Sequence, residues 1–130
     1  MNDAYGGVRG VVAQLTANPV PNTAPNLPAN PSFSQFKSDS STQIAKGTYT
    51  DEGVVVFKAT VSDPDGDPVS LQVDIQAVGG AFTGTPSSCT SPSVASGSVA
   101  TATCSGIADG EYKWQARADD GTDVSGWAEY

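Results

Sequence analysis

Residues 69–77 read Val-Ser-Leu-Gln-Val-Asp-Ile-Gln-Ala, an unbroken alternation of apolar and polar side chains. Residues 54–61 and 111–118 repeat the same period of two. Because successive side chains of a strand point to opposite faces, each segment predicts a strand with one buried and one solvated face. The residues expected in the core are Val55, Phe57, Ala59, Val61, Val69, Leu71, Val73, Ile75, Ala77, Tyr112, Trp114, Ala116 and Ala118.

The polar side chains of these segments are expected in water: Lys58, Thr60, Ser70, Gln72, Asp74, Gln76, Lys113, Gln115 and Arg117. Weaker strands are predicted at residues 81–85, 98–104 and 123–130. Turn signals separate the segments, above all Asp-Pro-Asp-Gly-Asp-Pro at residues 63–68. Short alternating strands with turns between them predict an all-β chain, folded as an antiparallel β-sandwich.

The first part of the chain has a different composition. Five prolines fall within thirteen residues and predict an extended connector: Pro19, Pro21, Pro25, Pro28 and Pro31. We therefore expect an N-terminal arm and linker at residues 1–24 and one domain at residues 25–130. Residues 5–15 fit a helix or a strand, and are either a frayed tail or an arm that packs on this domain or a neighbour.

The overall charge argues against several classes of partner. The chain of 130 residues has six basic residues, a net charge of −8 and a pI near 4.1. Nucleic acids and anionic lipid surfaces attract clusters of Lys and Arg, which this sequence lacks. No stretch approaches the ~20 apolar residues that span a bilayer, so no direct membrane insertion is expected. The first residues do not resemble a signal peptide, so a secreted form is expected to be a mature chain or a fragment.

The two cysteines, Cys89 and Cys104, are too far apart for a redox pair and too few for a zinc site. We expect a disulfide between them, which closes a loop of about 15 residues and contributes about 3 kcal/mol in the chain-entropy model. Disulfides persist in oxidising compartments, so the protein is expected to be secreted, at the cell surface or periplasmic. The alternative is two free thiols in a reducing cell.

Histidine is absent from the sequence. This removes the commonest general base, and it excludes Ser-His-Asp and Cys-His nucleophiles. The three glutamates lie in no catalytic motif, and the glycine pairs lack the spacing of a phosphate-binding loop. We therefore expect a protein that is not an enzyme and has no cofactor other than a candidate calcium ion.

Aspartates gather in two loops. Asp63, Asp65 and Asp67 alternate in the first loop, and the second contains Asp119, Asp120 and Asp123. Calcium takes six to eight oxygen ligands, and the first loop supplies several. Pro68 replaces the glycine of a helix-loop-helix site, which leaves a loop-bound ion. The alternative is that turns favour Asp and Gly for conformational reasons. Placement of the two loops at opposite ends of the sandwich would exclude a shared site.

Residues 107–127, which include Tyr112, Trp114 and Trp127, resemble the end of a bacterial fibronectin type III-like domain. Residues 57–71 resemble strands of the same modules and of immunoglobulin-like, cadherin-like repeats. The resemblance covers roughly residues 25–130. It implies that the Tyr112 hydroxyl bonds back to the loop near Ile107, that Trp114 fills the core and that Trp127 covers an open edge. These families are mostly spacers or adhesive modules of extracellular proteins.

Three functions remain open. The first is a structural or adhesive module that presents loops to a protein or polysaccharide, or spaces its neighbours. The second is a subunit of a fibre or pilus that self-associates through residues 5–15, because an unpaired sheet edge accepts an added strand. The third is a carbohydrate-binding appendage of a secreted hydrolase, with Trp127 and Tyr130 stacking on sugar rings or, alternatively, packing at the edge.

Overall fold

The computed structural model describes residues 20–87 and 89–130. Over these residues the chain forms strands and one short 3-10 helix, η2 (Asn30–Ser32). The strands are β1 (Ser34–Phe36), β2 (Val55–Thr60), β3 (Ser70–Ala77), β4 (Cys89–Thr90), β5 (Val99–Cys104), β6 (Tyr112–Asp119) and β7 (Ala128–Glu129). The predicted all-β class is confirmed.

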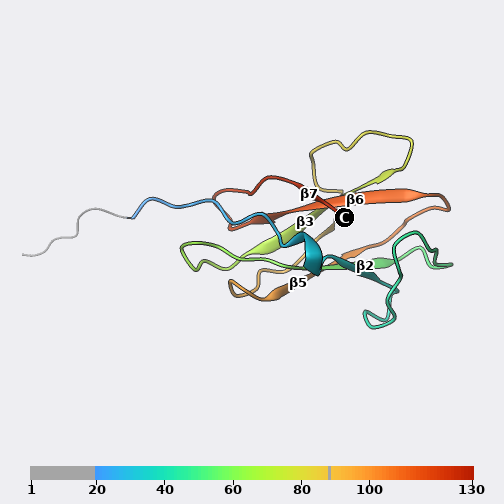
Figure 1. Cartoon of the computed structure of the whole chain (residues 1–130), viewed down its shortest axis with the longest axis horizontal. Helices are drawn as coiled ribbons and strands as arrows, with labels where there is room; N and C mark the ends of the chain where they lie inside the picture. The colour runs from blue at the N-terminus through green and yellow to red at the C-terminus, as the bar shows by residue number, and fades with distance from the viewer. Residues whose placement is uncertain (1–19, 88) are drawn as a thin grey trace, which may run out of the picture.

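Two antiparallel sheets form the domain. One has the order β1-β2-β5, and the other has the order β4-β3-β6-β7. Figure 1 shows β6 and β7 on one side of the molecule and β2 and β5 on the other. The longest ladder joins β3 to β6 and runs from Ser70 opposite Asp119 to Ala77 opposite Tyr112. The start of β3 therefore lies beside the end of β6, which brings the two aspartate loops to the same end.

The apolar faces of the two sheets form one core. Nine predicted core residues are buried: Phe57, Ala59, Val61, Val69, Leu71, Val73, Trp114, Ala116 and Ala118. Val55 and Ile75 are half-buried and pack against this cluster. Trp114 lies at its aromatic centre, stacked between Phe33 and Tyr130 with ring centroids 5.0 Å away in each case. The period of two thus identifies the buried side of each main strand.

Two predicted core residues are exposed. Tyr112 is 39% exposed, and Ala77 also lies in water. These residues face each other on the last rung of the β3–β6 ladder, where the alternation continues beyond the buried part of the sheet. The Tyr112 hydroxyl donates a hydrogen bond to the carbonyl oxygen of Ala108 at 2.9 Å, next to Ile107. Tyr112 therefore fastens a loop and does not fill the core.

Three predicted solvent-facing residues are buried: Ser70, Asp74 and Gln115. Residues 81–85, which we predicted as a strand, form no strand and bend at residues 84–85. The amides of Thr83 and Gly84 donate to Asp74 Oδ2 at 3.0 Å each, and Gln115 Nε2 donates to the same oxygen at 3.0 Å. These loop amides thus donate to a side chain of β3 and not to the backbone of a neighbouring strand. The segment consequently folds over the outer face of the sheet.

The other weak strands are found in part. Residues 98–104 contain β5 as predicted, whereas residues 123–130 contain only the two-residue β7 and a bridge between Asp119 and Val124. Val56, on the side of β2 expected to be solvated, is buried. Its cross-strand partner is Phe36, whose ring lies 4.4 Å from the Lys58 ammonium. Both faces of this sheet are therefore covered at β2.

The predicted disulfide is present. Cys89 of β4 and Cys104 of β5 are bonded, with their Cα atoms 5.0 Å apart. Because β4 and β5 belong to different sheets, the bond joins the two layers. Residues 5–15 lie outside the described residues. Within the described part of the chain, no helix has the length and apolar character needed to cross a membrane.

Candidate metal centre

The loop between β2 and β3 turns around Asp63. Gly66 adopts a φ of +79° that favours glycine, and its amide donates to the Asp63 carbonyl oxygen at 3.1 Å. Asp63 Oδ1 accepts hydrogen bonds from the amides of Asp65 and Asp67, at 2.7 and 3.3 Å. Each of the three aspartates offers a carboxylate oxygen within 4.8 Å of the other two. The alternating spacing therefore collects three acidic side chains at one point.

Asp63 differs from its neighbours in burial. Only 6% of its surface is exposed, and its buried Oδ2 atom has no hydrogen-bond partner among residues 20–87 and 89–130. The amide of Asp63 is fixed by the hydroxyl of Ser96, which accepts from it at 2.9 Å. Asp63 Oδ1 thus accepts hydrogen bonds from amides of its own turn, whereas Asp63 Oδ2 has no partner among the described residues.

The second aspartate loop lies at the same end of the molecule. Asp120 Oδ1 accepts from the amides of Thr122 and Asp123, both at 2.7 Å. Hydrogen bonds from Asp123, Asn22 and Thr122 hold the pKa of Asp120 below its usual value, and Asp63 also acts on it. The carboxylate of Asp119 accepts from Gln72 Nε2 and from the amide of Gly121.

The linker completes this end of the domain. Asn22 Nδ2 donates to Asp120 Oδ2 and to Asp123 Oδ2, at 3.0 Å each. The amide of Thr23 donates to Asp65 Oδ2 at 2.6 Å. A hollow is lined by Val20, Pro21, Asn22, Asp65 and Asp67. The sequence did not indicate Asn22, since an isolated Asn in a Pro-rich segment is indistinguishable from its neighbours.

The charges at this end repel one another. Desolvation and the neighbouring charges of Asp63, Asp65 and Asp120 raise the pKa of Asp67 above its usual value. This direction is the one expected when a carboxylate lies among other carboxylates. Oxygen atoms in such a group are hard ligands of the kind that calcium binds. The arrangement is therefore chemically suited to a divalent cation.

The chain can be compared with known families, proteins and structures. No family model, curated protein or solved structure matches this chain. The assignment of a function therefore depends on the residues themselves.

The two aromatic residues proposed as sugar platforms pack within the domain. The Arg117 guanidinium lies 4.6 Å from the ring centroid of Trp127, which is half-buried. Tyr130 is also half-buried, stacks on Trp114 and has the Lys46 ammonium 4.9 Å from its ring centroid. One face of each ring is thus in contact with another side chain of the domain.

A cleft lies at the other end of the β3–β6 ladder. It is lined in part by Tyr49, Tyr112 and Tyr130, and by the carboxylates of Glu52, Asp109 and Glu111. Tyr49 is 90% exposed. The sequence did not indicate this cleft, because residues 44–53 and 107–113 form it together only in the folded chain.

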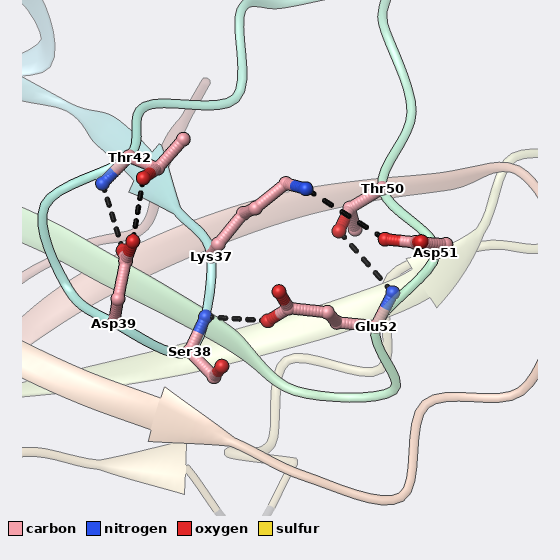
Figure 2. Close-up of polar contacts among 7 residues, drawn as sticks. All are labelled: Lys37, Ser38, Asp39, Thr42, Thr50, Asp51 and Glu52. Carbon is pink, nitrogen blue, oxygen red and sulfur yellow. Dashed lines mark hydrogen bonds and ion pairs between the residues drawn. The ribbon is translucent and has the colours of Figure 1, made fainter.

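Polar contacts hold the loop that forms one wall of this cleft. Figure 2 shows Glu52 and Asp51 reaching back toward residues 37–38. The amide of Ser38 donates to Glu52 Oε1 at 2.8 Å, and Lys37 Nζ lies 3.7 Å from Asp51 Oδ1. In the preceding turn, the hydroxyl and amide of Thr42 and the amide of Ser41 lower the pKa of Asp39 to about 2. These contacts give residues 37–52 a defined conformation.

Proposed function

We propose that the chain is a non-catalytic β-sandwich module, fibronectin type III-like or immunoglobulin-like, of a secreted or cell-surface bacterial protein. Its role is to space neighbouring segments and to set the direction in which the preceding chain leaves the domain. The two antiparallel sheets and the disulfide between them support this proposal, since disulfides persist outside the reducing cytosol.

The observation that carries the proposal is the attachment of residues 22–29, which are the end of the linker and the first residues of the domain. Pro25 and Pro28 are buried against the domain. The amides of Asn26 and Ala29 donate to the carbonyl oxygens of Ser62 and Thr60, at 3.0 and 3.3 Å. Asn26 Nδ2 adds a hydrogen bond to Ser62 Oγ at 3.0 Å. A free linker would let neighbouring domains reorient, whereas this one is fastened over residues 22–29.

Backbone order tests this role. In ¹⁵N relaxation measurements on the whole chain, residues 22–29 are expected to have order parameters of about 0.8 or more, similar to those of β3 and β6. The Asn26→Ala variant should lower the values for residues 22–26 and leave the strands unchanged. Order parameters below about 0.6 throughout residues 22–29 of the unmodified chain would contradict a fixed linker.

A second candidate function is carbohydrate binding at the cleft near Tyr49. An exposed aromatic ring beside carboxylates offers both a stacking face and hydrogen-bond acceptors for hydroxyl groups. This cleft favours the carbohydrate-binding alternative more than Trp127 does, because Trp127 is half-buried beneath Arg117.

Binding to a glycan array separates the two carbohydrate hypotheses. If the cleft binds a sugar, Tyr49→Ala should abolish the signal and Trp127→Ala should retain it. Loss with Trp127→Ala alone would place the sugar at the C-terminal edge, and no signal with any glycan would count against carbohydrate binding.

A further inference from the structure

We propose that the acidic end of the domain binds one calcium ion, with Asp63, Asp65 and Asp67 as its central ligands. The site goes beyond the spacer role, because a module without the ion would still separate its neighbours. Four lines of observation lead to it.

The first observation is the unpartnered oxygen of Asp63. A buried carboxylate oxygen without a hydrogen bond is rare, because the loss of its hydration is not compensated. Asp63 Oδ2 has no partner among the described residues, and one carboxylate oxygen of Asp63 lies within 4.8 Å of one from Asp65 and one from Asp67. A cation at this point supplies the missing interaction and removes the cost of burying the charge.

The second observation is the position of the basic side chains. Each of the five within residues 20–87 and 89–130 makes its contacts elsewhere. Lys37 pairs with Asp51, and Arg117 Nε donates to Gln72 while its guanidinium covers Trp127. Three lysines lie over aromatic rings: Lys46 over Tyr130, Lys58 over Phe36 and Lys113 over Phe82. In the described chain, the aspartates therefore have hydrogen-bond donors around them and no basic side chain among their contacts.

The third observation is the distance between the carboxylate oxygens of the three aspartates. Calcium binds oxygen at 2.3–2.6 Å, so two ligands on opposite sides of the ion are about 4.6–5.2 Å apart. The three carboxylate oxygens lie within 4.8 Å of one another, which fits this sphere. Magnesium requires near-ideal octahedral geometry at 2.0–2.1 Å and retains several waters, so a turn with three carboxylates suits calcium better. Zinc prefers nitrogen and sulfur ligands, and the sequence has no histidine and no free cysteine.

The fourth observation is that two loops and the linker meet here. The antiparallel register of β3 and β6 places the loop that follows Asp119 beside the loop that precedes Ser70, so the two aspartate loops are neighbours. Thr23 and Asn22 donate to carboxylates of the two loops. Binding of an ion would reduce the repulsion among these carboxylates and strengthen the end of the domain to which the linker is attached.

Isothermal titration with calcium chloride tests the site directly. The metal-free protein should bind one calcium ion with a dissociation constant in the range of about 10⁻⁴–10⁻³ M that is typical of extracellular modules. Magnesium should bind at least about tenfold more weakly. The melting temperature should rise by roughly 5 °C in 10 mM calcium, because the ion binds only the folded state.

Two variants of equal charge provide the comparison. Asp67→Asn removes a ligand whose carboxylate accepts no hydrogen bond in the described contacts, and it should weaken calcium binding about tenfold or more. Asp109→Asn, at the other end of the domain, should bind like the unmodified protein. Circular dichroism establishes that each variant is folded, and Asp65→Asn replaces Asp67→Asn if the latter is not. The proposal is overturned if the unmodified protein shows neither binding heat nor a melting shift, or if both variants lose affinity equally.

Discussion

Asp74 accepts hydrogen bonds from four residues, of which Thr83 and Gly84 belong to the loop folded over the sheet. Replacing it with alanine leaves two loop amides and the Gln115 amide without their acceptor in a buried place. We expect Asp74→Ala to lower the free energy of unfolding by about 3 kcal/mol. Urea unfolding followed by Trp fluorescence measures the change. Asp109→Ala, an exposed carboxylate, should change stability by less than about 0.5 kcal/mol.

Asp74 also predicts a dependence of stability on pH. Its burial raises the pKa of the carboxyl, but hydrogen bonds from Gln76, Gly84, Gln115 and Thr83 outweigh this and hold the pKa below its usual value. The unfolded chain consequently takes up the proton first as the pH falls. The contribution of Asp74 to stability is present above the unfolded pKa of about 4, and it is lost as the pH falls through the lower folded value.

The measurement is a comparison of unfolding free energies between pH 6 and pH 2 for the unmodified protein and Asp74→Asn. The unmodified protein should lose more stability over this range than the variant, so the difference between them narrows as the pH falls. A difference that stays constant with pH would show that the charge of Asp74 does not stabilise the fold.

Two single residues also show where the sequence pattern predicts the wrong exposure of a side chain. The alternation assigned Tyr112 to the core and Asp74 to solvent, because the period of two specifies only the side of a strand on which a residue lies. Exposure depends in addition on where the opposite sheet ends and on which loops fold over the outer face. The alternation of apolar and polar residues does not indicate that the core ends before Tyr112. It also does not indicate that the loop at Thr83 covers Asp74.

At the scale of elements, the disulfide carries a distinct prediction. Cys89 lies in the two-residue strand β4, which is too short to hold its place by backbone pairing alone. Reduction should lower the unfolding free energy by about 3 kcal/mol, the value expected for a closed loop of about 15 residues. Urea midpoints with and without a thiol reductant measure the loss.

The control for this experiment is the double variant Cys89→Ser/Cys104→Ser. It should be as unstable as the reduced protein and should not respond to reductant. Equal urea midpoints of the oxidised and reduced unmodified protein would contradict a stabilising link between the sheets.

The three main strands and β5 were predictable, whereas β4 and the extent of β7 were not. β2, β3 and β6 are six to eight residues long, so the alternation of apolar and polar side chains along them is visible in the sequence. β4 and β7 have two residues each, which is too short to show any period. The position of the second aspartate loop follows from the antiparallel register of β3 and β6, which only the structure supplies.

At the scale of the whole molecule, three alternating segments in the sequence predict the two layers of the sandwich. They do not predict how the residues before β1 attach to the domain. The composition predicted an extended linker, and residues 20–29 form no helix or strand. Its attachment depends on individual contacts of Asn22, Thr23 and Asn26 with distant loops. Such contacts join residues more than thirty positions apart and have no local signature.

The calcium proposal brings the two loops and the linker together at one acidic end of the domain. A ¹H–¹⁵N NMR titration of the unmodified chain with calcium tests it most directly. The amide signals of residues 22–23, 63–67 and 119–123 should shift together and saturate at one equivalent bound, while those of residues 38–52 and 107–111 stay in place. Signals that do not move, or that drift without saturation across all acidic loops, would contradict the account.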